Sequence, residues 1–440
     1  MLTVVKYNLV CQILILLSFS GFFRFTASAQ KMEESAVEYS RFGLEDGLSN
    51  NSVTALFQDD EGFLWIGTED GLNRYDGYEF RTYRHDPSNR HSISGNFIQT
   101  IMQDRHGNLW IGTRNRGLNK LDHARGEFTS YLSGQSGRTL PETGVYGLAE
   151  DGAGKLWVKT KNYVSSFEGD SAGFKNYGHY NNVFNVIDAI RYPLHLESDS
   201  TFLVGTKDGI NRFNVHNKQF IRFSCDSNEQ FSCEDAVFDL IPFSSRRFLV
   251  ASSSGVKFLN IDSIVTIESF VPEGKKSPQT RVNDLLKRAN GDILAGTRSG
   301  LKLYKADPQN ENHPFLFHKK LLEQYQITSM VEDRSGIVWA GTRNNGLFKL
   351  DFTPAKFNAF SAENNAGLPD TIASYNFQSV FQDKEGYIWL GTLNKGVCKY
   401  HPQKKTLRRY ILDKKAASKN EDAVYCLYQD HTGKLWAGTS

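Results

Sequence analysis

The sequence predicts an all-β fold in which four-stranded sheets repeat along the chain, and three observations support this prediction. All six Trp of the 440 residues occupy one slot of a motif that usually reads W-x-G-T. The motif recurs without Trp at three intermediate positions, and successive copies lie 45 to 50 residues apart. The composition, with 37 Gly, 13% aromatic residues and only 4 Met, favours strands and tight turns over helices. The slot is filled in order by Trp65, Trp110, Trp157, Leu203, Leu249, Leu294, Trp339, Trp389 and Trp436.

The first copy shows what one repeat contains. A turn is expected at residues 59–62, where Asp59 can bond the backbone two residues on and Gly62 can supply a positive φ. Asp70 and Gly71 form a two-residue hairpin signal. Four short antiparallel strands every 40 to 50 residues or so describe one blade of a β-propeller, whose blades stack around an axis. The strands expected here are residues 52–58, 63–68, 72–76 and 80–83.

The repeated Trp admits two interpretations. Exposed Trp side chains often stack on sugars, which would make the repeat a lectin-like surface. Here, however, each Trp recurs at one blade position, and Gly67 follows Trp65 two residues on along the same face. We therefore favour packing between neighbouring blades, with the Gly leaving room for the neighbour.

The spacing also predicts where rings close. Seven copies precede the longest spacing, 50 residues, so residues 37–355 are expected to form a first seven-bladed propeller. Residues 37–42 resemble a fourth strand and should complete blade seven by pairing with Leu347–Asp351. A similar segment, 357–360, would open a second propeller over residues 356–440, which holds only its first, incomplete blades. Because KLWAGTS stops inside a strand, we expect the N-terminal part of a longer protein.

Residues 1–29 form a signal peptide, which predicts an exported, periplasmic chain. One Lys precedes an apolar run too short to span a bilayer, and Ala27-Ser28-Ala29 predicts cleavage before Gln30. Four Cys then remain, too few for a disulfide scaffold. Cys225 and Cys233 can pair or stay reduced, and no zinc-like spacing occurs.

Charge and motifs exclude several functions. The 51 Lys and Arg nearly balance the 49 Asp and Glu, which argues against nucleic-acid binding by this segment. Neither a Gly-rich phosphate loop nor a kinase or metal-ligand motif is present, so we expect no catalytic residue, cofactor or metal in this segment.

Two columns of the aligned repeats are candidate ligand contacts. The residue after the motif Thr or Ser is Glu69 in copy one and Ser253 in copy five, but a cation in five copies. Such cations can pair with carboxylates or sulfates, although solvated turn charge is the simpler interpretation and the one we favour. The cations are Arg114, Lys161, Lys207, Arg298 and Arg343.

The second column lies early in the expected innermost strand and reads Asp188, Asp239 and Asp284 in copies four to six. These carboxylates could bind sugar hydroxyls or Ca²⁺. Alternatively, each could accept a hydrogen bond from the backbone of its neighbouring blade, which is the interpretation that we favour. If these carboxylates face the same opening of the propeller as the cations, we expect the ligand to be a uronate- or sulfate-containing oligosaccharide.

The residues F-G-L-E-D-G-L-S-N-N-S-V, followed by Q-D-x-x-G-x-L-W-I-G-T-x-D-G-L-N-R-Y-D-G, resemble the two-component regulator propeller repeat. That repeat is typical of periplasmic sensors of hybrid two-component systems in Bacteroidetes-type bacteria, and the resemblance covers residues 37–440. It implies two propellers, an immunoglobulin-like domain, an inner-membrane helix, a histidine kinase, a receiver and a DNA-binding domain, in a homodimer. It further implies that oligosaccharide binding controls a phosphorelay and the transcription of glycan-use genes.

Two other classes stay open. A secreted propeller enzyme of the polysaccharide lyase type would need a basic residue and a Tyr or His converging in the channel. A protein-interaction scaffold would need no small ligand. Related repeats also precede diguanylate cyclases and transcription factors, so the output module stays open as well.

Overall fold

The structure is a computed structural model, and it describes residues 37–134, 138–178, 193–222, 235–244, 246–261, 266–269, 281–307, 315–353, 376–393, 395–402, 406–410 and 423–439. The chain divides into two compact units, Met1–Thr353 and Pro354–Ser440. Each unit is described below by itself.

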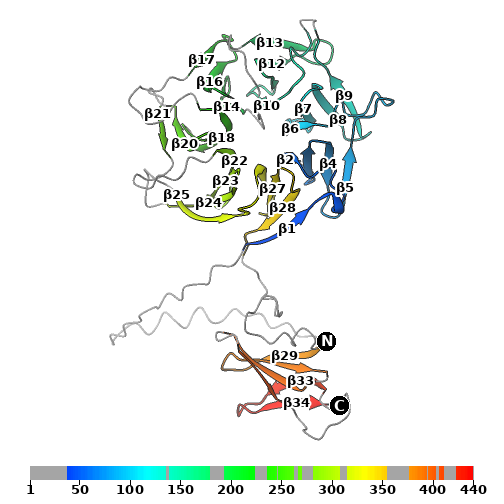
Figure 1. The fold of residues 1–440 in the computed structure, drawn as a ribbon, viewed down its shortest axis with the longest axis vertical. Coiled ribbons are helices and arrows are strands. Elements are labelled where there is room, and N and C mark those ends of the chain that lie inside the picture. Colours follow the sequence, from blue (N-terminus) through cyan, green and yellow to red (C-terminus); the bar gives the residue numbers. More distant parts are fainter. Residues whose placement is uncertain are drawn as a thin grey trace, which may run out of the picture. The chain divides into compact units, whose positions relative to one another are not determined.

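The described part of the first unit contains seven four-stranded antiparallel sheets around a central axis (Figure 1), which we number as blades one to seven. Their first strands, from β2 to β26, lie innermost. Blades one to three are β2 (Val53–Gln58), β3 (Leu64–Thr68), β4 (Gly71–Tyr75) and β5 (Phe80–Tyr83); β6 (Ile98–Gln103), β7 (Leu109–Thr113), β8 (Leu118–Asp122) and β9 (Glu127–Tyr131); and β10 (Gly147–Glu150), β11 (Leu156–Lys159), β12 (Tyr163–Phe167) and β13 (Phe174–Gly178).

Blades four to six repeat this order. They are β14 (Leu194–Ser198), β15 (Thr201–Thr206), β16 (Gly209–Asn214) and β17 (Phe220–Arg222); β18 (Val237–Ser244), β19 (Arg247–Ser252), β20 (Gly255–Asn260) and β21 (Thr266–Ser269); and β22 (Val282–Lys287), β23 (Ile293–Thr297), β24 (Gly300–Ala306) and β25 (Phe315–Leu321). Blade seven consists of β26 (Ile327–Glu332), β27 (Val338–Thr342), β28 (Leu347–Asp351) and β1 (Glu38–Phe42), and a 3-10 turn, Leu44–Asp46, follows β1. The predicted all-β propeller fold is confirmed.

The first unit closes through its N-terminal strand. β1 pairs antiparallel with β28, so that Tyr39 lies opposite Leu350 and Phe42 opposite Leu347. Across the same junction, the Thr328 hydroxyl donates a 2.7 Å hydrogen bond to the Val53 carbonyl. The predicted pairing of residues 37–42 with blade seven is therefore confirmed.

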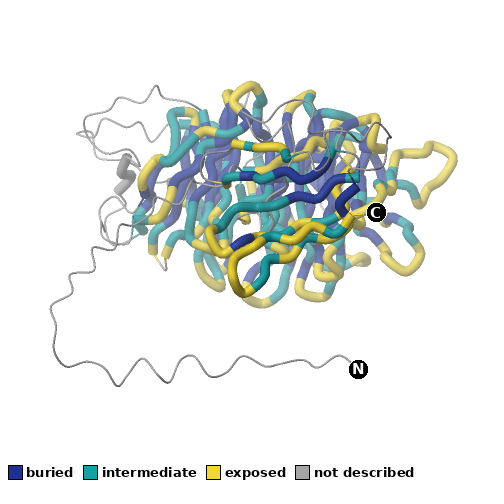
Figure 2. Tube along the Cα trace, turned by 90° about the horizontal axis from the view of Figure 1, so that it is seen from below, coloured by how far each residue is buried: buried dark blue, intermediate teal, exposed yellow. Residues whose placement is uncertain are grey.

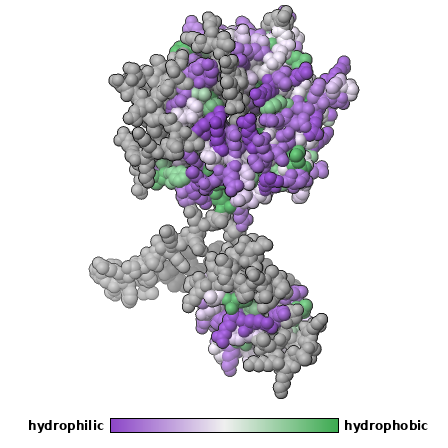
Figure 3. Space-filling model, viewed as in Figure 1, coloured by the Kyte–Doolittle hydropathy of each residue, from purple (hydrophilic) through white to green (hydrophobic). Residues whose placement is uncertain are grey.

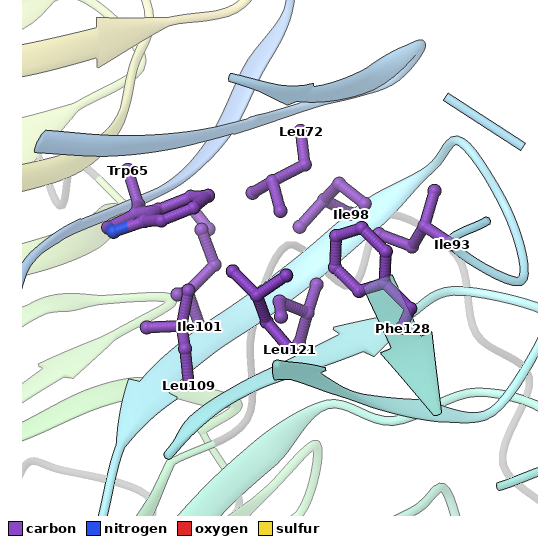
Figure 4. Close-up of a cluster of buried hydrophobic side chains, with 10 residues drawn as sticks. Trp65, Leu72, Ile93, Ile98, Ile101, Leu109, Leu121 and Phe128 are labelled. Atoms are coloured by element: carbon purple, nitrogen blue, oxygen red, sulfur yellow. The ribbon is translucent and has the colours of Figure 1, made fainter. Parts of the chain in front are cut away.

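The Trp side chains pack between blades. Trp65 is fully buried and lies over Ile101 and Leu109 of blade two in one hydrophobic cluster (Figure 4). A Cβ added to Gly67 would stand 2.6 Å from a methyl carbon of Ile98, so that position needs Gly. The packing interpretation is confirmed for the first unit, whose Trp residues are all at most 5% exposed.

Each Trp is also anchored by a carboxylate six residues earlier. The indole Nε1 donates to Asp Oδ2 while Oδ1 accepts turn amides, as Asp59 does from Glu61 and Phe63. Where Leu replaces Trp, residue −6 is not Asp but Glu197, Phe243 or Arg288. The pairs, at 2.6 to 2.8 Å, are Trp65–Asp59, Trp110–Asp104, Trp157–Asp151, Trp339–Asp333, Trp389–Asp383 and Trp436–Asp430.

The second unit contains one four-stranded sheet and one two-stranded sheet in its described part. The strands are β29 (Phe377–Gln382), β30 (Ile388–Thr392), β31 (Val397–His401) and β32 (Thr406–Tyr410), then β33 (Val424–Gln429) and β34 (Leu435–Thr439). Trp436 is 60% exposed and Val380 is 72% exposed, in contrast to the buried Trp of the first unit. The same repeat is therefore folded here with part of its apolar surface uncovered.

Burial follows the strands of the blades, while their turns are exposed (Figure 2). Within the described ranges, no helix has the length and apolar character that crossing a bilayer requires. The predicted signal peptide and the Cys225–Cys233 pair lie outside the described residues. Cys398 is buried, Cys426 is exposed, and both are free thiols.

Candidate ligand-binding mouth

The cation column lies at the end of the first unit where the innermost strands begin, which we call the mouth. In an antiparallel blade, the turn between its second and third strands returns to that end. Backbone hydrogen bonds place the column residues at the same end. The amide of a column residue donates to the carbonyl of the residue that precedes the innermost strand of its blade. The donor–acceptor pairs, at 2.9 to 3.1 Å, are Glu69–Ser52, Arg114–Phe97, Ser253–Ala236 and Arg343–Gln326.

The motif Thr holds each of these turns in shape. The Thr68 hydroxyl donates to the Gly71 carbonyl at 2.9 Å and accepts from the Asp70 amide at 3.1 Å. The same hydroxyl-to-carbonyl bond spans the turns that carry four of the cations. Its partners are Thr113–Gly117, Thr206–Gly209, Thr297–Gly300 and Thr342–Gly346. The cation column thus stands on turns whose backbone is fixed, which suits a preorganised binding surface.

The turns of blades seven, one and two are also joined to the loops that lead into the next blades. Gly71 donates its amide to the Asn96 carbonyl at 2.8 Å, and Gly346 donates to Asn51 at 2.8 Å. Between blades two and three the contact is double, because Gly117 donates to Thr143 at 2.7 Å and Val145 donates to Thr113 at 2.9 Å. From blade seven through blades one and two to blade three, the turns and loops of the mouth therefore form a connected rim.

The five cations differ in exposure and partners. The Arg114 guanidinium lies 4.9 Å from the centre of the Phe97 ring. The Lys207 ammonium lies 3.5 Å from an Asp208 carboxylate oxygen, a partly exposed pair that contributes little to stability. Arg114, Arg298 and Arg343 are exposed, whereas Lys161 and Lys207 are half-buried. On the face of the first unit that Figure 3 shows, the described surface is mainly hydrophilic.

Two members of the Asp column join blades. Asp239 Oδ2 accepts the amide of Leu285 in blade six at 2.9 Å, and Asp284 Oδ2 accepts the amide of Met330 in blade seven at 2.5 Å. Ser329 fills the same position in blade seven and accepts the Leu56 amide at 3.1 Å. The carboxylates thus bond the backbone of the neighbouring blade, which is the interpretation that the sequence favoured.

Asp188 lies outside the described residues. The sequence predicts that Asp188 lies early in the innermost strand of blade four, but the innermost strand of this blade is β14, which begins at Leu194. Leu194 pairs with Val204, and the Gly205 amide donates to the Pro193 carbonyl at 2.9 Å, so Pro193 occupies the column position. In the described ranges, no cluster of three or more His, Cys, Asp or Glu could hold a metal ion.

The structure adds residues that the sequence analysis missed. Glu142, in the loop before blade three, accepts the Asn162 backbone amide at 2.8 Å and its side-chain amide at 2.6 Å. Tyr146 directly precedes β10, and its own amide donates to the Lys159 carbonyl at 2.8 Å. Across the ring, the Arg281 guanidinium lies 4.0 Å from the centre of the Phe238 ring. Of these residues, only Lys159 is visible as an exception in the sequence, because KLWVKT has Lys where copy five has Ala251 and the other copies have Gly.

Two of these groups have shifted acidities. Burial lowers the pKa of the Lys159 ammonium to about 8, and the nearby Glu142 charge opposes that shift. Burial raises the pKa of Tyr146, with the Arg114 charge acting against it and the Glu142 charge adding to it. Glu142 therefore lies close enough to Lys159 and Tyr146, and Arg114 close enough to Tyr146, to shift their pKa values.

The blades and their rim define a repeat-built β-propeller with a polar mouth. Five segments match the family model described as "Two component regulator propeller", namely residues 47–70, 92–115, 321–344, 371–394 and 418–440. Segments in both units thus match the two-component regulator propeller model, and the resemblance drawn from the sequence is confirmed.

Three similar proteins help to place the chain. A stretch of 72 residues is 44% identical to histidine kinase P4 of Formosa agariphila and makes up 16% of this chain and 5% of that protein. The extracellular domain of a hybrid two-component system of B. thetaiotaomicron is 22% identical, with a TM-score of 0.61 over 92% of this chain and 52% of that one. Virginiamycin B lyase of Staphylococcus aureus is 12% identical, with a TM-score of 0.54 over 72% of this chain and 99% of the lyase.

These likenesses differ in what they show. The two solved structures share the fold, at identities too low to carry function. The chain spans about half the length of the extracellular domain that it matches and a small part of the kinase.

Proposed function

We propose that this chain is the periplasmic, ligand-sensing segment of a hybrid two-component sensor kinase. The repeats are shared with proteins of that kind, and one relative is named a histidine kinase. On this proposal, the signal peptide exports the segment and an inner-membrane helix of the longer, homodimeric protein carries the response to the kinase. The output is a phosphorelay that controls glycan-use genes.

The ligand that the mouth suits best is an acidic oligosaccharide. The observation that carries this is the rim of the mouth, which places four of the five cations on turns that the motif Thr holds. Arg and Lys side chains at such positions can bind carboxylate or sulfate groups. Partly exposed aromatic rings such as Phe97 offer a surface for sugar rings, and loop amides and hydroxyls supply hydrogen bonds.

A propeller lyase is the second candidate, because Arg114 and Tyr146 do meet at the mouth. A tyrosine that serves as a general base must ionise near the working pH. Burial instead raises the pKa of Tyr146, which favours a binding role over a catalytic one.

The test is calorimetry on the exported protein with matched neutral, uronate-containing and sulfated oligosaccharides, together with an assay for unsaturated cleavage products. We expect saturable binding of an acidic member without cleavage. Cleavage would establish the lyase, and absence of binding across the panel would contradict the sensing proposal.

A further inference from the structure

Blade three departs from the repeat where its sheet meets the mouth. Lys159 replaces the motif Gly and is only 1% exposed, and it pairs across the sheet with Gly147. In this blade the Gly stands on the innermost strand, as Gly147, and its lack of a side chain leaves room for the long Lys159 side chain between the blades. The Lys159 ammonium lies 3.3 Å from the Thr160 carbonyl, so it is held at the mouth end of the strand.

The groups around this Lys form a corner of the rim that we call the Lys159 corner: Arg114, Glu142, Tyr146, Lys159 and Asn162. The backbone fixes it from both sides, because Val145 donates to Thr113 and Tyr146 donates to Lys159. Among the described residues of the corner, Glu142 supplies the carboxylate, and it accepts hydrogen bonds from two donors of Asn162.

Among its described residues, the corner holds more positive than negative charge. Arg114 and Lys159 bring two cations against one carboxylate, and Lys161 adds a third beside Asn162. Taking an ammonium out of water is costly, and an anion nearby recovers part of that cost. Lys159 is too deeply buried to make first contact, whereas the Arg114 side chain is exposed.

We propose that the Lys159 corner is an anion subsite of the mouth, which takes a carboxylate or sulfate group beside Arg114 while Lys159 supplies positive charge from between the blades. This deepens the proposed function, on which it rests for the identity of the ligand. It places one anion-binding position at blades two and three, within the mouth around which the cation column lies.

The test uses inorganic sulfate and acetate on the whole exported protein, with chloride at matched ionic strength as the reference. Lysines labelled with carbon-13 at Cε report the pKa of Lys159 by NMR, and the Lys159→Met variant assigns the signal. A bound anion stabilises the charged amine, so we expect 20 mM of the preferred anion to raise this pKa by about 0.5. A response to sulfate alone indicates a sulfated ligand, and a response to acetate indicates a uronate.

Matched variants decide whether the corner is responsible. Arg114→Gln should abolish the shift, whereas Arg298→Gln, another column cation, should leave it intact. Glu142→Gln should strengthen anion binding about threefold or more by removing the competing carboxylate. If Lys159→Met does not fold, stabilisation by sulfate in thermal denaturation of the wild type and the two Arg variants gives the same comparison.

An unchanged Lys159 pKa with both anions, or an equal response in Arg114→Gln and the wild type, would overturn the subsite. Because neither probe is a sugar, that failure is distinct from failure of the sensing proposal. Oligosaccharide binding that persists without any anion response would overturn the subsite alone.

Discussion

The Trp110 indole donates a 2.8 Å hydrogen bond to the Asp104 carboxylate, which also holds the turn between β6 and β7 through the amides of His106 and Asn108. One Asp thereby links the turn of a blade to the aromatic side chain that packs on the next blade. This explains why the repeat retains Asp and Trp together, and loses them together in blades four to six.

Replacing Asp104 by Ala should destabilise the first unit by about 2–4 kcal/mol, because it leaves a buried indole N–H and two turn amides without their acceptor. Urea denaturation measures the loss. The exposed Asp86→Ala, whose carboxylate serves only local loop donors, is the control and should cost far less. Similar losses for the two variants would contradict the role given to the Trp–Asp link.

The same link predicts a dependence of stability on pH. Burial alone would raise the pKa of Asp104, but hydrogen bonds from Trp110, Asn108 and His106 outweigh it and hold the pKa below its ordinary value. The stabilisation is therefore complete above the unfolded-state pKa of about 3.9 and is lost as the pH falls through the lower folded-state pKa. Urea midpoints between pH 6 and pH 2 should decline less steeply in Asp104→Asn than in the wild type. Parallel curves would count against this.

Close approach of the blades predicts a penalty for any side chain at the motif Gly. The Cβ of Gly67→Ala would stand 2.6 Å from a methyl carbon and 2.9 Å from Cβ of Ile98, so we expect a loss of about 1–3 kcal/mol. Gly178→Ala is the control, since its Cβ would meet only the edge of the Tyr163 ring at 3.2 Å. Thermal denaturation that ranks the two variants equally would argue against tight packing at Gly67.

Ring closure depends on Phe42, whose ring lies 5.9 Å from that of Trp339 and 5.7 Å from that of Tyr75. Phe42→Ala should destabilise the first unit by about 2–4 kcal/mol, because β1 loses its anchor between blades seven and one. Tyr39→Ala, at a position 61% exposed on the same strand, should cost much less. Equal melting temperatures for Phe42→Ala and Tyr39→Ala would contradict closure through β1.

Limited proteolysis should cut the second unit first. Its described strands leave Trp436, Tyr428 and Val380 between 60% and 72% exposed, so its blades share less buried area than those of the first unit. We expect early fragments that end near residue 354, identified by mass spectrometry, and a persistent first unit. Equal digestion of the two units would oppose this.

The sequence predicted the blades and the closing strand because their signals are local: turn residues, alternating strands and a recurring Trp. The interpretation favoured for Asp239 and Asp284, a bond to the backbone of the neighbouring blade, is the one that their hydrogen bonds bear out. Asp188 was misplaced because an apolar run preceded the true innermost strand. Tyr146 and Glu142 lie in a loop that does not repeat, so no column of aligned copies could draw attention to them.

The central claim is that the mouth of the first unit binds an acidic oligosaccharide through its cations. The most direct test is calorimetry on the exported protein with an acidic oligosaccharide found in the panel, comparing wild type with Lys161→Ala/Lys207→Ala. A control removes two cations outside the column, in Arg81→Ala/Arg125→Ala. We predict that the mouth variant binds at least about tenfold more weakly, with a smaller dependence on salt, and that the control binds like the wild type. Unchanged affinity in the mouth variant would contradict the account.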